Sequence, residues 1–183
     1  MSAPRALIDA CVLYPNVLRE IVLGVAATGA LVPLWSPRII AEWQHAAARL
    51  GEGAATVAEG EAALLRAHWP EAEVPPDPTL EGRLDLPDPA DRHVLAAAIT
   101  ARAEVIITLN LRDFPARALA AHGLRARSPD DVLMDAWLAD PEAVALAVAR
   151  VQAETERISG RGQSLRALLK RARLPRLGKA LTA

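Results

Sequence analysis

The sequence predicts an α/β fold in which a parallel sheet is flanked by helices and followed by a C-terminal helical extension. Two short segments rich in branched apolar side chains, 5–8 and 104–109, each end at a polar residue, as buried strands do. Helical stretches of ten or more residues separate the strands, and this spacing is typical of a parallel sheet covered by helices. An alanine- and leucine-rich composition favours those helices.

The remaining elements follow in order along the chain. A further strand is expected over 31–35, where Pro33 confines it to a sheet edge or a strand end. A fourth strand is predicted over 124–127. Residues 69–87 contain five prolines, so we expect a loop with a short strand, long enough to border a functional site. The predicted helices are 15–29, 37–50, 54–68, 89–102, 115–122, 129–138, 141–158 and 164–173.

Four helix starts share one local signal, a capping side chain followed by proline. The cap side chain accepts a hydrogen bond from a free backbone N–H, and proline at the first helical position has no N–H to lose. The signal therefore predicts that a helix begins at each of these four prolines. The four pairs are Ser36-Pro37, Asp88-Pro89, Ser128-Pro129 and Asp140-Pro141.

Charge and composition suggest two parts, a domain over 1–127 and a helical extension over 128–183 with a basic tail. All 22 acidic residues precede residue 157, and eight of the 21 basic residues follow Glu156. We expect the tail to meet nucleic acid or the acidic body, or to be a solvated basic helix. One cysteine excludes an intramolecular disulfide, and we recognise neither a signal peptide nor a membrane span, so a cytoplasmic protein without membrane contact is expected.

Four acidic residues are candidates for a metal-dependent active site. Asp9 follows the first strand, Glu42 lies early in the helix that begins at Pro37, Asp91 lies three residues after Asp88, and Asp113 follows the strand over 104–109. The carboxyl ends of parallel strands line one crevice, so these carboxylates are expected to converge. Converging carboxylates favour a hard cation such as Mg²⁺ or Mn²⁺, and such ions can activate water for phosphodiester cleavage.

Each candidate also has a purely structural interpretation. Asp9 could be a turn residue, Glu42 a solvated helix residue, Asp91 part of a capping box, and Asp113 the start of the helix near Pro115. Asp88 is interpreted as a helix cap more readily than as a ligand, because a proline follows it.

Other chemistry finds less support in the sequence. The four histidines, His45, His68, His93 and His122, lack the spacing of a zinc hydrolase. His93 could reach a phosphate, but we expect it on the surface of its helix. Cys11 is interpreted as a small apolar residue near the site, since no basic partner is apparent.

At the acidic residues the sequence resembles a known family. The strings ALIDACVLYP, WSPRIIAEW, DPADRHVLAAAITARAEVIITLN and NLRDFP resemble a PIN domain, and among its branches the VapC-type toxins of prokaryotic toxin–antitoxin pairs. The resemblance covers residues 5 to about 127. It implies a Mg²⁺- or Mn²⁺-dependent ribonuclease in which Asp9, Glu42 and Asp91 match the first three acidic positions. The fourth is assigned to Asp113, with Asn110 as a neutral neighbour.

The leading functional hypothesis is therefore an endoribonuclease toxin that acts on RNA and is held inactive by a cognate antitoxin protein. Catalysis and metal binding are assigned to the same four carboxylates, Asp9, Glu42, Asp91 and Asp113. The alternative is a non-catalytic module on the same fold that binds nucleic acid or protein, and a phosphomonoester hydrolase is a third class. A homodimer is an assembly that the sequence leaves open.

Overall fold

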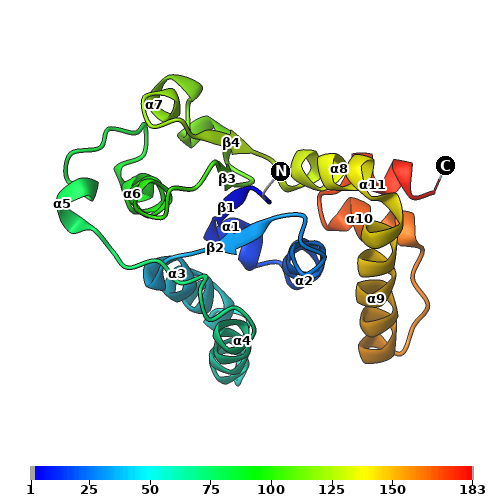
Figure 1. The fold of residues 1–183 in the computed structure, drawn as a ribbon. Coiled ribbons are helices and arrows are strands. Elements are labelled where there is room, and N and C mark those ends of the chain that lie inside the picture. Colours follow the sequence, from blue (N-terminus) through cyan, green and yellow to red (C-terminus); the bar gives the residue numbers. More distant parts are fainter. Residues whose placement is uncertain (1–2, 183) are drawn as a thin grey trace.

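The computed structural model describes residues 3–182 of the 183-residue chain. Its centre is a four-stranded parallel sheet with the order β2-β1-β3-β4, and helices flank this sheet (Figure 1). All three strand pairs are parallel, which confirms the predicted α/β class. The strands are β1 (Arg5–Ile8), β2 (Val32–Leu34), β3 (Val105–Ile107) and β4 (Arg125–Arg127).

The two central strands carry the most buried side chains of the sheet. Leu7 of β1 pairs with Leu34 of β2 on one side and with Ile106 of β3 on the other, and all three are at most 1% exposed. Strand β2 lies at the edge of the sheet, where the missing N–H of Pro33 is tolerated. The carboxyl ends of β1 and β3 are therefore adjacent, and residues that follow them share one edge of the sheet.

Helices account for most of the remaining chain. The predicted helices are present in order, but two short helices, over 10–13 and 78–81, were not predicted, and the second lies in the segment expected to be a loop with a short strand. The four predicted cap-and-proline starts are all confirmed: the side chains of Ser36, Asp88, Ser128 and Asp140 each accept a hydrogen bond from a backbone N–H of the following turn. The helices are α1 (Ala10–Leu13), α2 (Asn16–Ala26), α3 (Pro37–Ala48), α4 (Ala54–His68), α5 (Pro78–Glu81), α6 (Arg92–Thr100), α7 (Ala116–Ala120), α8 (Pro129–Ala139), α9 (Pro141–Ser159), α10 (Leu165–Arg171) and α11 (Pro175–Ala180), with 3-10 turns η1 (Pro89–Asp91) and η2 (Leu111–Asp113).

A further departure from the predicted elements lies at the C-terminal end. The predicted helix over 164–173 ends at Arg171, and a separate helix, α11, follows it. The carboxylate of Asp130 in α8 accepts hydrogen bonds from the backbone N–H groups of Arg176 (2.9 Å) and Leu177 (3.0 Å) at the start of α11. Asp130 lies more than 40 positions away from α11 in the chain, so no local sequence pattern predicts this cap.

The C-terminal helices share the hydrophobic core of the sheet domain. Helix α9 packs on α2, where the Cβ of Ala147 lies 3.7 Å from the position a Cβ on Gly24 would take. Leu133 of α8, Val148 of α9 and Leu177 of α11 belong to the same buried cluster as the strands. The helices thus bury their apolar faces on the α/β domain and on one another, and the division into 1–127 and 128–183 stays a prediction.

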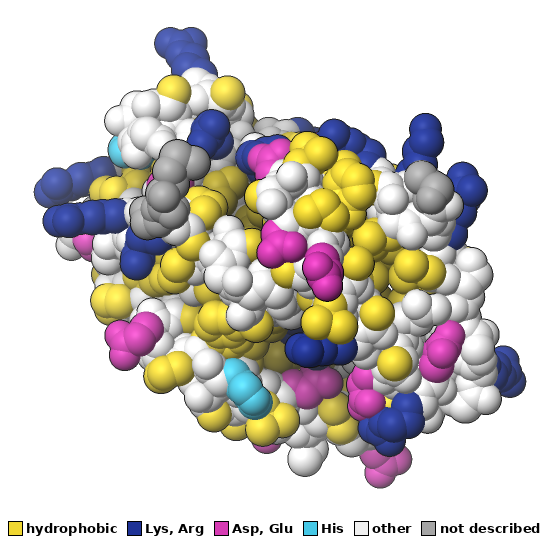
Figure 2. All heavy atoms as spheres, turned by 45° about the vertical axis from the view of Figure 1, so that its right-hand side comes forward, with side chains coloured by type: hydrophobic (Ala, Val, Ile, Leu, Met, Phe, Trp, Pro, Cys, Tyr) yellow, Lys and Arg dark blue, Asp and Glu magenta, His cyan; other side chains and the backbone are white. Residues whose placement is uncertain are grey.

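The basic tail contacts the first helix of the C-terminal extension. Arg176 forms an ion pair with Asp131 of α8, which lies in the acidic part of the chain that precedes residue 157. Figure 2 turns forward the side on which α8 to α11 lie, and Lys and Arg side chains are scattered over this view without forming one patch. Within residues 3–182, no helix is both long enough and apolar enough to cross a membrane.

Candidate functional site

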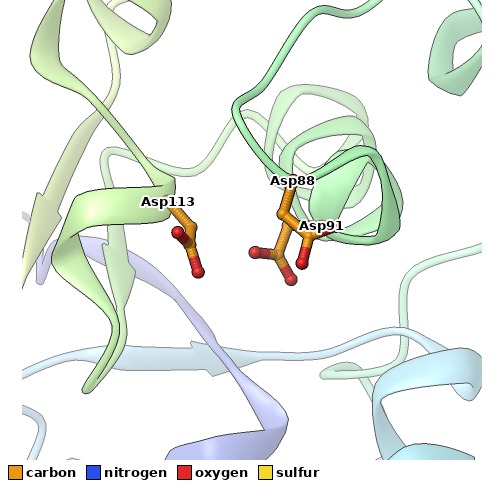
Figure 3. A group of neighbouring side chains, drawn as sticks. All are labelled: Asp88, Asp91 and Asp113. Carbon is orange, nitrogen blue, oxygen red and sulfur yellow. The ribbon is translucent and has the colours of Figure 1, made fainter.

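Three aspartates form a compact group at one end of the sheet. Asp88, Asp91 and Asp113 each offer a carboxylate oxygen, and the three oxygens lie within 4.8 Å of one another. Figure 3 shows Asp88 and Asp91 extending from one turn toward Asp113 on the opposite segment. The donor set consists of carboxylate oxygens alone, which suits hard divalent cations such as Mg²⁺ and Mn²⁺.

The 3-10 turn η1 places two of these carboxylates. Asp88 caps η1, because its Oδ1 accepts a hydrogen bond of 2.8 Å from the N–H of Ala90. Asp91 ends the same turn directly before α6, and its side chain makes no capping hydrogen bond. A spacing of three residues brings both side chains to the same side of a helical turn. Asp88 is thus the predicted cap and, unexpectedly, also a member of the acidic group.

The second 3-10 turn, η2, supplies Asp113. It directly follows the segment that leaves β3, and the side-chain amide of Asn110 donates a hydrogen bond to Oδ2 of Asp113. The backbone N–H of Asn110 in turn donates to Oγ1 of Thr108 at 3.0 Å. Asn110 therefore orients the fourth predicted carboxylate while carrying no charge itself.

Asp9 lies deeper than the other aspartates, where β1 ends. It is 8% exposed, and its N–H donates to the carbonyl oxygen of Ile107 in β3 at 3.0 Å. Its Oδ2 accepts hydrogen bonds from Oγ1 of Thr108 (2.7 Å) and from the thiol of Cys11 (3.1 Å). These contacts fix the carboxylate at the junction of the two central strands.

Glu42 approaches from helix α3 and is not part of the compact aspartate group. Its Oε1 lies 3.0 Å from Nε2 of His93 and 3.2 Å from Nε of Arg38. Burial alone would raise the pKa of the Glu42 carboxyl, but the hydrogen bond and charge of His93, together with Arg38, outweigh it and lower this pKa. Glu42 is therefore held in its ionised form beside α6.

Negative charge is concentrated around Asp91. Partial burial, followed by the charges of Asp9, Asp88 and Asp113, raises the pKa of Asp91 from 3.8 to about 6, while His93 opposes the rise. Four carboxylates thus act on one another through space, and a cation between them would relieve the repulsion. Of the four predicted residues, the structure places Asp91 and Asp113 in the compact group, leaves Asp9 near enough to act on Asp91 by its charge, and holds Glu42 apart from the group beside His93.

Two neighbouring residues were assigned on the basis of sequence alone, with different outcomes. His93 was expected on the surface, and this was wrong: its side chain is 5% exposed, because α6 is buried along most of its length. Cys11 lies next to the site as expected, and burial together with the charge of Asp9 raises the pKa of its thiol to about 12, which leaves it a poor nucleophile.

Two open cavities border the sheet domain. One, of about 420 Å³, runs beside Glu42 along α3 and is lined in part by Arg38, His45 and Arg49. The other, of about 350 Å³, is mostly apolar and is lined in part by Val32 of the edge strand and by Trp69. Only the first adjoins a predicted site residue.

Comparison with known proteins gives two matches. A family model described as "PIN domain" matches residues 5–112, which is more than half of the chain. A protein of Mycobacterium tuberculosis (strain ATCC 25618 / H37Rv) with the name "Putative ribonuclease VapC50" is 58% identical over 45 residues. That match covers 25% of this chain and 27% of the relative. No solved structure matches the chain.

Proposed function

The chain belongs to the PIN-domain family, and we propose that it is a metal-dependent endoribonuclease that acts as the toxin of a toxin–antitoxin pair. The observation that carries the proposal is the group of three carboxylate oxygens within 4.8 Å of one another. The name of the partial relative, a putative ribonuclease, supports RNA as the substrate.

We assign binding of Mg²⁺ or Mn²⁺ to Asp9, Glu42, Asp91 and Asp113, and we add Asp88 to this set. When bound, a divalent cation supplies positive charge that activates a water molecule and stabilises the leaving oxygen of a phosphodiester. The raised pKa of Asp91 supports a cation. It shows that the charges of Asp9, Asp88 and Asp113 disfavour ionisation of Asp91, and a bound cation would offset this repulsion.

The protein's own residues have distinct tasks in this proposal. Asp9, fixed by Thr108, presents its second oxygen, Oδ1, from the junction of the central strands. Asp88 and Asp91 approach the site from η1, and Asp113 approaches it from η2. The substrate phosphate is also negatively charged, so it would bind beside these carboxylates only with a cation that neutralises them.

The partners in this proposal follow from the family resemblance. RNA is the substrate, and a cognate antitoxin protein holds the enzyme inactive until its release. The cytoplasmic location and the homodimer considered from the sequence stay predictions. A short reading frame beside this one is the expected source of the antitoxin, and its purified product should inhibit RNA cleavage.

Cleavage of end-labelled single-stranded RNA tests the activity. We expect fragments in Mn²⁺ or Mg²⁺, none in a chelator, and none with Asp9→Asn, whereas Glu59→Gln on the exposed surface of α4 should cleave like the wild type. RNA binding without cleavage in either metal would overturn the proposal in favour of a non-catalytic binding module. Hydrolysis of a phosphomonoester without RNA cleavage would instead favour a phosphatase.

A further inference from the structure

His93 has an environment that packing alone does not explain. The imidazole lies in the first turn of α6 with its side chain 5% exposed, and Nε2 lies 3.0 Å from Oε1 of Glu42. Its other nitrogen, Nδ1, is buried with no hydrogen-bond partner among residues 3–182. Burial of a polar ring is costly when one of its nitrogens has no partner. The contact between Nε2 and Glu42 is therefore the polar interaction that His93 makes in this buried position.

The same oxygen of Glu42 is contacted twice. Nε of Arg38 lies 3.2 Å from Oε1, and the guanidinium extends to Oε1 of Glu81 (3.0 Å) and to the carbonyl oxygen of Ala90 (3.5 Å). Ala90 lies in η1, between the two aspartates of that turn, so Arg38 connects α3 to the turn that carries them. No hydrogen-bond donor among the described residues reaches Oε2 of Glu42, which leaves that oxygen available to a ligand.

The two donors differ in how firmly they can hold Glu42. Arg38 is 48% exposed, so water screens its ion pair and its side chain keeps much of its freedom. His93 is buried and has two side-chain torsions, so it provides a fixed contact in a medium of lower dielectric constant. Glu42 itself is 42% exposed. Without the contact to His93 its side chain would sample several rotamers, and fixing one of them when a metal ion binds would cost conformational entropy.

We propose that His93 is a positioning residue for Glu42: it holds Oε1 and so presents Oε2 to the divalent cation of the acidic site. The proposal rests on the metal-dependent function proposed above. Groups that orient a metal ligand contribute to affinity although they never touch the metal, and their removal typically weakens metal binding about 10- to 100-fold. Loss of the His93 contact should therefore appear as weaker metal binding, with the fold intact.

A pair of substitutions separates this role from core packing. His93→Gln keeps an N–H donor near the place of Nε2, whereas the side chain of Asn is too short to reach Glu42. By titration calorimetry, we expect His93→Asn to weaken Mn²⁺ binding about tenfold or more and His93→Gln to bind close to wild type. His122→Asn, at an exposed histidine after α7, is the matched control and should leave Mn²⁺ affinity unchanged.

A double-mutant cycle tests whether His93 acts through Glu42. In a Glu42→Gln background, His93→Asn should cause little further loss of Mn²⁺ affinity, because the carboxylate it positions is gone. Cleavage by His93→Asn should fall at limiting Mn²⁺ and recover at saturating Mn²⁺. A lower melting temperature with unchanged Mn²⁺ affinity, or additive losses in the cycle, would overturn the inference and leave only a packing role.

The metal-binding measurement also keeps this inference distinct from the proposed function. Wild-type protein that binds Mn²⁺ but cleaves no RNA would refute the ribonuclease activity while the His93 variants still decide the positioning role. Wild-type protein that does not bind Mn²⁺ would overturn both.

Discussion

Repulsion within the acidic group predicts that Asp91→Asn stabilises the metal-free protein. The pKa of Asp91 is about 6 in the folded protein and 3.8 in its unperturbed state, so ionisation is harder after folding. Well below pH 3.8 the group is protonated in both states and has no effect on stability. As the pH rises through 3.8, the unfolded chain ionises first and the folded state loses stability, and this loss levels off once the pH is well above about 6.

The magnitude follows from the difference between these two pKa values. Each tenfold change in the ionisation constant corresponds to about 1.36 kcal/mol, so the upper limit is about 3 kcal/mol. Asp91 is partly exposed, and solvent screening reduces the expected effect to about 1 kcal/mol. The side chain makes no capping hydrogen bond that the asparagine would forfeit. For a chain of this size, 1 kcal/mol corresponds to a shift of about 2–4 °C in melting temperature.

The assay is a pair of thermal melts in chelator, at about pH 8 and about pH 3, for wild type, Asp91→Asn and the surface control Glu59→Gln. The asparagine variant should melt about 2–4 °C higher than wild type at the higher pH and at the same temperature at the lower pH. Added Mn²⁺ at about 100 times its dissociation constant should stabilise wild type by about 2.7 kcal/mol and the variant far less. An Asp91→Asn protein that melts at or below wild type at the higher pH would refute the repulsion.

Further predictions concern the other aspartates. Asp9→Asn should abolish RNA cleavage while circular dichroism and melting temperature show a folded protein, and full cleavage in Mg²⁺ would remove Asp9 from the site. Asp88→Ala should lower the free energy of unfolding by about 0.5–2 kcal/mol through loss of the cap on Ala90. Asp88→Asn, which keeps an acceptor for this cap, should lose Mn²⁺ affinity with little loss of stability, and equal melting temperatures for the two variants would contradict the cap. Asp130→Ala should cost about 1–3 kcal/mol in urea denaturation, because it leaves the N–H groups at the start of α11 without their acceptor, and an unchanged midpoint would show that this contact contributes nothing.

Local sequence was sufficient to predict the strands and most helix starts. The apolar segment before Asp9 and the pairs such as Ser36-Pro37 act within a few residues, through burial of branched side chains and through caps on adjacent N–H groups. The adjacency of strand ends in a parallel sheet then predicted which acidic residues could meet. Of the compact group of aspartates, Asp91 and Asp113 were among the residues expected to meet, whereas Asp88 was interpreted as a cap because a proline follows it.

Only the tertiary structure determined which partners those residues have. The contact between His93 and Glu42 joins helices separated by about 50 positions in the chain, and nothing near either residue specifies it. The burial of His93 depends on the complete packing of α6, and the start of α11 depends on the distant carboxylate of Asp130. Capping and apolar periodicity are short-range signals, whereas the surroundings of a site residue come from chain segments that meet only after the whole core has formed.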